Sequence, residues 1–265
     1  MKITKANNRH YGQYFEQALE SIINNEVIQN KTGFTFPQEH TDIMCTHAKK
    51  LANYLNSKEA KRVGDKTSNE SCDLKIDGQE IELKYVGSGS GTYFNTSMEY
   101  IVTLGFPSYH SCLEMGGYIE ALKGLFGDKV KEDNISPVSN ADSSFIRANY
   151  PEVYTKLSAW EGKIRALYVK EFFNFLQQNP DKKAQFITDM ITKDVSGKHI
   201  PDRLIVFNHS SETITDWSKK YLTSLADNDI INLSGKYSIN FGNAKATFAW
   251  QNGTGLNNPT IRVFI

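Results

Sequence analysis

The sequence has few cysteines, no long apolar run and no excess of charge of either sign. Only three cysteines occur among 265 residues, and no two of them form a CxxC pair. This argues against a disulfide framework and against a zinc site made of four thiolates. The sequence has no apolar run of about 18 residues and no apolar signal-peptide core at its N-terminus. We therefore expect a cytoplasmic protein that does not enter a membrane.

The absence of a net charge excludes a histone-like basic tail. Thirty basic side chains balance thirty acidic ones. Nucleic-acid binding stays open, because the positions of the charges matter more than their sum. Between residues 66 and 100, six acids outnumber three lysines, whereas residues 230–265 contain three basic side chains and no acid. The net charge of zero is therefore a sum over regions of opposite charge, an acidic one at 66–100 and a basic one at 230–265.

The spacing of apolar residues predicts both helices and strands, separated by polar turns. Hydrophobic residues make up 39% of the chain, as is usual for a folded globular protein. We predict helices over 11–25, 41–57, 118–126 and 158–178, a loop over 128–149, a buried strand over 203–208, and several antiparallel strands within 230–265. This order favours an α/β fold, with a mixed central β-sheet flanked by helices and an additional C-terminal antiparallel β region.

Residues 72–86, CDLKIDGQEIELKYV, have the pattern of a β-hairpin. Apolar and polar residues alternate, and Asp77-Gly78 is a strong signal for a two-residue turn. Such a turn pairs Ile76 with Gln79 and, farther from the turn, Asp73 with Glu82. The expected apolar face contains Leu74, Ile76, Ile81, Leu83 and Tyr85. The expected charged face contains Asp73, Lys75, Glu80, Glu82 and Lys84.

The charged face of this hairpin offers ligands for a metal ion. Two opposed carboxylates repel each other by a few tenths to about 1 kcal/mol unless a cation lies between them. Asp73, Glu82 and the backbone carbonyl of Leu83 could hold Mg²⁺, which prefers oxygen ligands. Lys84 would then orient or activate a water and stabilise charge at a phosphoryl group. Alternatively the face is simply solvated, with Lys75 paired to Glu80.

These residues resemble the motif of the PD-(D/E)xK nuclease superfamily, most closely that of type II restriction endonucleases. The matching residues are Asp73 and the tripeptide Glu82-Leu83-Lys84, although Cys72 stands where the motif has proline. The resemblance covers residues 11 to 100 and implies a restriction-endonuclease-like core in which the two acids bind Mg²⁺. Many members of the family also place a glutamate on a preceding helix.

In this chain the helix over 11–25 offers two glutamates for that additional position. At about 100° per residue, Glu16 borders the apolar stripe of the helix, while Glu20 faces away from it. We therefore take Glu16 as the accessory acid. The alternative is that it is an ordinary solvated charge on the helix.

The resemblance implies a sequence-specific, Mg²⁺-dependent endonuclease that hydrolyses double-stranded DNA. It also implies a cognate DNA methyltransferase in the same host and, often, a homodimer that matches a palindromic site. A single nuclease domain would span residues 1–265, with its catalytic core in 11–100 and 160–210 and a DNA-contacting β region in 230–265. Two alternatives stay open: a structure-specific or repair nuclease with the same core, and a non-catalytic DNA-binding protein.

The candidate DNA contacts lie in the basic tail and in the GSGSG segment that follows the hairpin. Lysine and arginine suit phosphates, asparagine suits adenine edges, and small residues allow a phosphate backbone to approach closely. The candidates are Lys236, Lys245, Asn257, Asn258, Arg262, Ser88 and Ser90. The alternative for the asparagines is turn chemistry. For the nearby aromatic residues Phe241 and Phe248, we favour a place in the core of a sheet.

Two further patterns point away from other sites. Pro201-Asp202 is a literal PD, but no E-x-K or D-x-K follows within the next thirty residues, so we interpret Asp202 as a strand-start or turn residue. The six histidines never occur as HxH or HxxxH, which makes a zinc site improbable.

Overall fold

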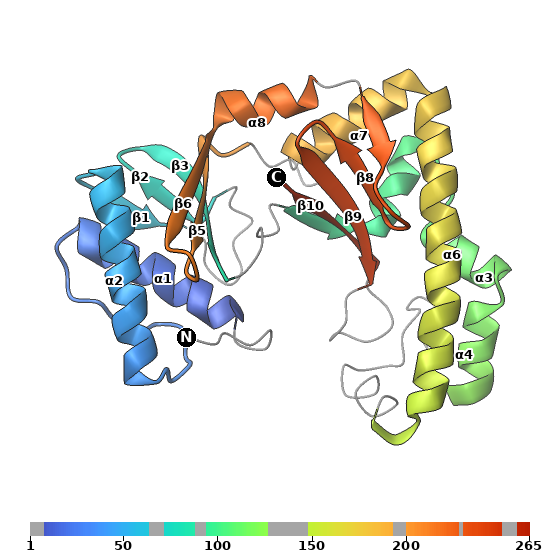
Figure 1. Cartoon of the computed structure of the whole chain (residues 1–265), viewed down its shortest axis with the longest axis horizontal. Coiled ribbons are helices and arrows are strands. Elements are labelled where there is room, and N and C mark those ends of the chain that lie inside the picture. Colours follow the sequence, from blue (N-terminus) through green and yellow to red (C-terminus); the bar gives the residue numbers. More distant parts are fainter. Residues whose placement is uncertain are drawn as a thin grey trace. The chain divides into compact units, whose positions relative to one another are not determined.

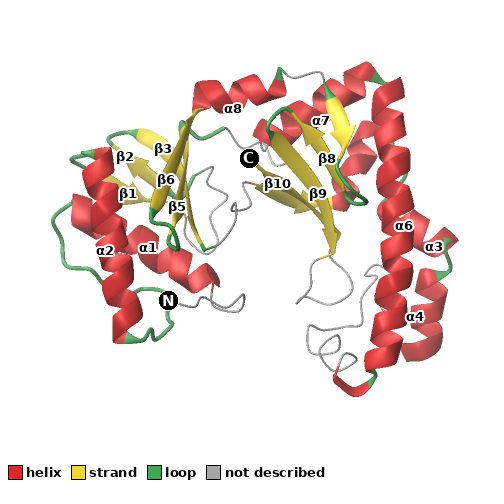
Figure 2. Cartoon of the chain, in the orientation of Figure 1, coloured by secondary structure: helices red, strands yellow, loops and turns green. Residues whose placement is uncertain are grey.

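Two β-sheets of five strands each organise the chain. The computed structural model describes residues 8–63, 72–87, 94–126, 148–192, 200–227, 230–250 and 259–265 (Figures 1 and 2). The chain divides into unit 1, made of Met1–Gly91 and Thr192–Ser224, and unit 2, made of Thr92–Ile191 and Leu225–Ile265. The predicted catalytic core therefore has residues in both units. The assignment of one nuclease domain to residues 1–265 stays a prediction.

Unit 1 contains the mixed sheet that the sequence predicts. Its strands follow the order β1-β2-β3-β5-β6, with β3 and β5 parallel and every other neighbouring pair antiparallel. The prediction of a mixed α/β fold with a mixed sheet and flanking helices is thus confirmed. The elements are α1 (Asn8–Ile23), α2 (Gln38–Leu55), β1 (Ala60–Arg62), β2 (Leu74–Ile76), β3 (Gln79–Val86), β5 (Arg203–Asn208), β6 (Thr213–Ser218) and most of α8 (Lys219–Ala226), whose last two residues belong to unit 2.

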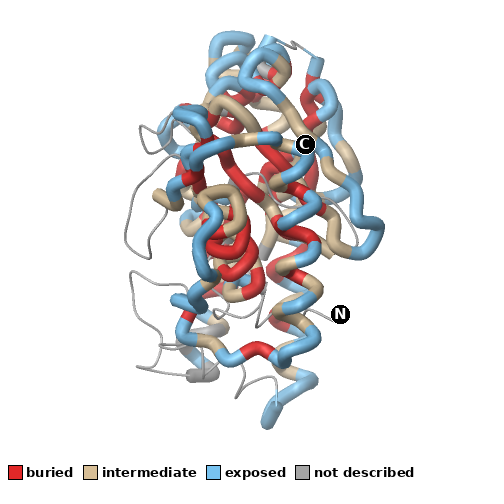
Figure 3. The backbone as a smooth tube through the Cα atoms, turned by 90° about the vertical axis from the view of Figure 1, so that its left-hand side faces the viewer, coloured by how far each residue is buried: buried red, intermediate tan, exposed pale blue. Residues whose placement is uncertain are grey.

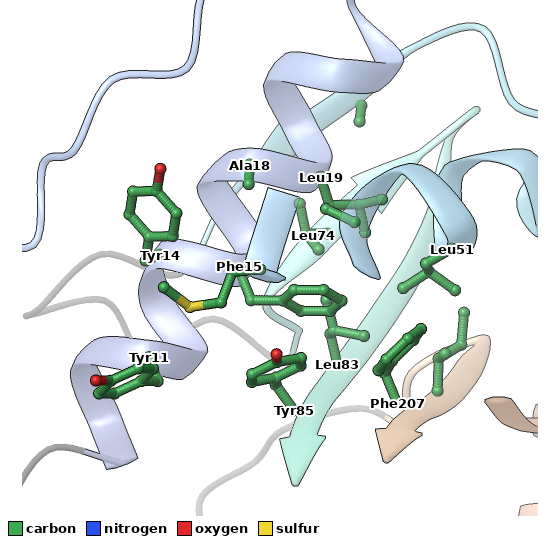
Figure 4. Close-up of a cluster of buried hydrophobic side chains, with 14 of the residues drawn as sticks. Tyr11, Tyr14, Phe15, Ala18, Leu19, Leu51, Leu74, Leu83, Tyr85 and Phe207 are labelled. Atoms are coloured by element: carbon green, nitrogen blue, oxygen red, sulfur yellow. The ribbon is translucent and has the colours of Figure 1, made fainter. Parts of the chain in front are cut away.

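The core of unit 1 lies between this sheet and the helices α1 and α2. Phe15 is fully buried and stacks on Tyr85 of β3, with the ring centroids 4.2 Å apart (Figure 4). The apolar face predicted for the hairpin belongs entirely to this core cluster, namely Leu74, Ile76, Ile81, Leu83 and Tyr85. Because side chains alternate along a strand, the residues between them point to the opposite face. The core packing therefore fixes the direction of Glu82 and Lys84.

The β2–β3 turn has the local structure that Asp77-Gly78 predicts. Both residues have positive φ, 48° and 80°, as a type I′ turn requires. The Asp77 carboxylate also accepts hydrogen bonds from the backbone amides of Lys58 and Glu59, at 3.1 and 3.0 Å. These bonds hold the pKa of Asp77 below its ordinary value. The predicted register is confirmed for the three pairs Ile76–Gln79, Lys75–Glu80 and Leu74–Ile81.

Unit 2 contains an antiparallel sheet with the strand order β4-β10-β9-β8-β7. Its elements are β4 (Phe94–Ser97), the 3₁₀ helix η1 (Met98–Leu104), α3 (Tyr109–Met115), α4 (Tyr118–Phe126), α6 (Pro151–Gln178), α7 (Pro180–Thr192), β7 (Ile231–Leu233), β8 (Ser238–Phe241), β9 (Ala244–Trp250) and β10 (Pro259–Phe264). The C-terminal antiparallel strands are as predicted, whereas β4 was not predicted. The predicted loop over 128–149 lies almost entirely outside the described residues.

Helices α6 and α7 contribute the aromatic residues that pack against this second sheet. Phe172 of α6 contacts Phe248 of β9 and Phe186 of α7 contacts Phe241 of β8, with centroid distances of 5.9 and 6.2 Å. Phe241 and Phe248 are therefore core residues, as we favoured from the sequence. Along the helices that can be seen in Figure 3, buried and exposed positions alternate, as expected for helices that cover a core with one side. Among the described helices, none is long and apolar enough to cross a membrane.

Candidate active site

One lysine and two carboxylates meet on the charged face of the β2–β3 hairpin. The Nζ atom of Lys84 lies 2.5 Å from Oε1 of Glu82 and 3.7 Å from Oδ2 of Asp73. Glu82 is 7% exposed, and the side chains of Asp73 and Lys84 are each 26% exposed. The structure thus brings together Asp73, Glu82 and Lys84, and it places an ammonium group where the sequence argument requires a cation.

Asp73 reaches this group in a different way from the one predicted. The paired register ends at Leu74 and Ile81, and the backbone amide of Asp73 donates to the carbonyl of Ile81 at 3.0 Å. Its Oδ2 atom accepts a hydrogen bond from the amide of Leu83 at 2.9 Å. The hairpin pattern predicts a ladder that continues to a direct Asp73–Glu82 pair. In the structure the Asp73 side chain instead crosses to the backbone of β3, which fixes its carboxylate beside Lys84.

The charged face of the hairpin offers a comparison between two lysine–glutamate pairs. Lys75 and Glu80 pair at 3.5 Å, as the solvated-face alternative expects, and their side chains are 44% and 29% exposed. In the Lys84–Glu82 pair the corresponding values are 26% and 10%. A partly desolvated ion pair interacts more strongly than one open to water, because less solvent screens it. The pair expected from the solvated-face alternative is therefore present at the Lys75–Glu80 end, and the metal-binding role of the Glu82–Lys84 end stays a prediction.

Lys84 remains a cation at neutral pH. Burial alone would lower its pKa, but the carboxylates of Glu82 and Asp73 outweigh burial and raise the pKa above its ordinary value. Lys84 can therefore donate hydrogen bonds and stabilise negative charge, but it is not poised to take up a proton.

Glu16 interacts electrostatically with Asp73 and Lys84. Its Oε2 atom accepts a hydrogen bond from Nε of Arg62 at 2.9 Å, and its side chain is 12% exposed. Burial and the nearby charge of Asp73 raise the pKa of Glu16 to about 7, although Arg62 and Lys84 act in the opposite direction. The neighbouring acid Glu20 instead accepts a hydrogen bond from the backbone amide of Arg62, at 2.7 Å. Of the two glutamates that the sequence offers, Glu16 is thus the one coupled to Asp73 and Lys84.

Arg62 is the residue that the sequence analysis missed. It belongs to β1, which is three residues long and pairs with β2 at the edge of the sheet. A strand of this length is too short to show a two-residue period. The nearest signal for a basic partner lay in helix α1, where two acids, Glu16 and Glu20, stand one turn apart and favour a nearby cation.

Replacing Glu16 by glutamine is expected to stabilise unit 1 at high pH. A raised pKa means that stability falls as the pH rises from about 4.5, where Glu16 ionises in the unfolded chain, to about 7, and stays low above that. The Glu16→Gln variant escapes this loss. Its free energy of unfolding should match that of the wild type near pH 5 and exceed it by on the order of 1 to 2 kcal/mol near pH 8. Urea denaturation at both pH values measures this, and an equal difference at both would contradict it.

The donor set of this group is compatible with Mg²⁺, although it is not a complete cage. Asp73 and Glu82 supply carboxylate oxygens that already face one cation, and oxygen ligands are those that Mg²⁺ prefers. Among the described residues, no three histidine, cysteine, aspartate or glutamate side chains are grouped closely enough to hold a metal ion. A bound Mg²⁺ would therefore take further ligands from water, substrate or a backbone carbonyl. The role of the Leu83 carbonyl stays a prediction.

The predicted DNA contacts are only partly described. Lys245 lies on β9 and Arg262 on β10, while Lys236 lies in the connection before β8. Ser88, Ser90, Asn257 and Asn258 lie outside the described residues.

Asp202 has the structural role that its sequence position predicts. It directly precedes β5, and its Oδ2 atom accepts a hydrogen bond from the amide of Glu80 at 2.9 Å. Its backbone carbonyl accepts a hydrogen bond from the amide of Lys219 at 2.7 Å. Asp202 of the Pro201-Asp202 dipeptide is thus a strand-start residue, as expected.

Comparison with known proteins assigns the chain to no family. No model of a known protein family matches the chain, and no curated protein sequence matches it. The chemistry of the site must therefore be argued from its own residues.

Proposed function

We propose that this protein is a Mg²⁺-dependent endonuclease that hydrolyses phosphodiester bonds in double-stranded DNA at specific sequences. The observation that carries the proposal is the convergence of Asp73 and Glu82 on one ammonium group, Lys84. Carboxylates can hold the metal ion of a metal-assisted phosphate hydrolysis, and a lysine can stabilise the charge that develops on the phosphoryl oxygens. The resemblance of Asp73 and Glu82-Leu83-Lys84 to the motif of type II restriction endonucleases supports the same reaction.

Asp73, Glu82 and the Leu83 carbonyl would hold the metal ion, which when bound would polarise a phosphoryl oxygen and make a water more acidic. The hydrogen bond from the Leu83 amide keeps the Asp73 carboxylate in place for this role. The cationic Lys84 would orient the attacking water and stabilise the charge that develops on the phosphoryl oxygens. Glu16 can accept a proton from water near neutral pH, because its pKa is about 7.

Direct hydrolysis is the simplest reaction of this group. Water adds to phosphorus, one P–O ester bond breaks, and the products are a phosphate monoester and a hydroxyl. No covalent intermediate is required. As part of the same proposal, a DNA methyltransferase in the host would protect its own sites, and a homodimer would suit a palindromic site.

A non-catalytic DNA-binding protein is the second candidate. The observation in its favour is the same lysine, because the ammonium of Lys84 contacts both carboxylates and already offsets one of their two negative charges. Two carboxylates that share a lysine repel each other less and have less need of a metal ion for stability.

Digestion of a sequenced, unmethylated DNA with Mg²⁺ separates these functions. We expect discrete fragments whose mapped ends share one short sequence, and no cleavage when EDTA removes the metal. Cleavage only at junctions or damaged bases would instead identify a structure-specific or repair nuclease. Binding without cleavage, at any divalent metal tested, would identify the non-catalytic protein.

A further inference from the structure

The sheet of unit 2 has two faces of opposite character. One face is apolar and packs against aromatic residues of α6 and α7, and its fully buried residues include Ile239, Phe241, Phe248 and Ile261. The residues that alternate with them must point to the other face. A sheet whose second face is polar offers that face to solvent or to a partner.

The register of the strands places polar side chains side by side on this second face. Arg262 of β10 lies between Asn95 of β4 and Thr247 of β9. Asn240 of β8 lies opposite Lys245 of β9, whose Nζ atom is 5.6 Å from the ring centroid of Phe264. We call Asn95, Asn240, Lys245, Thr247 and Arg262 the polar face of this sheet. Asn95 and Lys245 are exposed, and the other three are half-buried.

The strands that carry the polar face contain no acidic residue at all. None of β4, β7, β8, β9 and β10 includes an aspartate or a glutamate. The strands of unit 1 differ, because they include Glu80, Glu82 and Asp216. Five neighbouring strands that carry amides, hydroxyls and two cations, but no carboxylate, favour a partner that is itself anionic.

We propose that the polar face binds the sugar-phosphate backbone and groove edge of duplex DNA. This inference rests on the proposed function and identifies the surface that would hold its substrate. Lys245 and Arg262 are diagonal neighbours across β9 and β10, so their side chains can reach phosphates of one strand. Hydroxyl and amide groups such as those of Thr247 and Asn95 donate to phosphate and sugar oxygens, and asparagine can also read adenine.

The composition of the face favours a nucleic acid over a protein partner. The cores of protein interfaces are rich in large apolar and aromatic residues, whereas the polar face consists of two amides, one hydroxyl and two cations, with Phe264 beside Lys245 as an aromatic neighbour. Interfaces with DNA are more polar and more positive.

Charge reversal on the polar face tests the inference. The probe is a fluorescent duplex of about 25 base pairs, whose binding is followed by anisotropy in EDTA or Ca²⁺ over a range of salt concentrations. The Lys245→Glu/Arg262→Glu double variant should bind at least about 30-fold more weakly. The neutral Lys245→Gln/Arg262→Gln variant should lower the slope of log K against log salt by about 2, since each lost phosphate contact removes roughly 0.9.

The matched control reverses two lysines of the same unit. Lys163 and Lys170 of α6 are exposed, so Lys163→Glu/Lys170→Glu makes the same change of charge on a helix. We expect its affinity to stay within about threefold of the wild type. Circular dichroism and thermal unfolding confirm that each variant is folded, and the glutamine variant serves if the glutamate one does not fold.

The possible outcomes separate the inference from the proposed nuclease function. If the wild type cleaves DNA and both polar-face variants bind DNA as tightly as the wild type, the inference is overturned and the proposed nuclease function is unaffected. If these variants lose DNA binding and the wild type binds DNA without cleaving it, the inference is supported and the nuclease function is rejected. An equal loss in the α6 control overturns the inference, because it shows only a general effect of charge. Tighter binding of single-stranded DNA, RNA or an acidic peptide overturns the choice of duplex DNA.

Discussion

The Glu82→Gln variant is expected to lose at least about 10³-fold in Mg²⁺-dependent DNA cleavage while it keeps its fold. Glutamine has the size of glutamate and can still accept the hydrogen bond from Lys84, so the packing around this buried position is preserved. The variant lacks the negative charge that would bind the metal ion and balance Lys84. Losing one group that stabilises a charged transition state typically costs 10²- to 10³-fold, and a metal ligand should cost at least as much.

The control for this variant lies two residues earlier on the same strand. Glu80 points to the same face and also pairs with a lysine, Lys75, but it is more exposed. Glu80→Gln should cleave within about threefold of the wild-type rate. Single-turnover cleavage of a DNA with one mapped site, at saturating enzyme, measures both variants. A folded Glu82→Gln protein that cleaves within tenfold of the wild type would reject the proposed site.

The Lys84→Met variant should be less stable than the wild type without metal and should regain stability when Mg²⁺ or Ca²⁺ is added. Removing the ammonium leaves the carboxylates of Asp73 and Glu82 facing each other with one cation fewer. Breaking a buried ion pair costs about 3 to 5 kcal/mol, and we expect about 1 to 3 kcal/mol here because Lys84 is partly exposed. A divalent cation that binds only the folded state then stabilises the protein by mass action.

Thermal unfolding in EDTA and in millimolar Mg²⁺ or Ca²⁺ measures this effect without any need for catalysis. The Lys75→Met variant is the control, because it removes a lysine from the same face at the more exposed pair. It should lose little stability and respond to the metal no more than the wild type does. If Lys84→Met unfolds at the same temperature with and without metal, Asp73 and Glu82 are not metal ligands.

Local patterns made the hairpin and its charged face predictable. The turn at Asp77-Gly78 depends on neighbouring residues, and a two-residue loop leaves only one register for the strands beside it. The alternation of side chains then places Glu82 and Lys84 on one face, as the sequence analysis expected. These features need no information from distant parts of the chain.

Contacts between distant residues were not predictable in the same way. Beyond the Leu74–Ile81 pair, the Asp73 carboxylate accepts a hydrogen bond from the Leu83 amide, a side-chain contact that the alternation of residues does not predict. Arg62 reaches Glu16 only because β1 adds to the edge of the sheet beside α1. The raised pKa of Glu16 depends on burial by the whole core, which the helical spacing alone does not report. Strand β4 is likewise defined by its pairing with β10, far away in the sequence.

The pairing of β3 with β5 also constrains the order in which the protein can form as it is synthesised. Residues 87 to 202 are synthesised between these two parallel neighbours, and β4 likewise cannot pair with β10 until the later strand has been made. A ribosome adds about 5 to 20 residues per second, so the edges of β3 and β4 stay without these partners for several seconds after they emerge. Unpaired edges readily join other chains. The first sheet cannot close before β5 and β6 are made, and the second cannot close before β10 is made, so the nascent chain should depend on chaperones during these intervals.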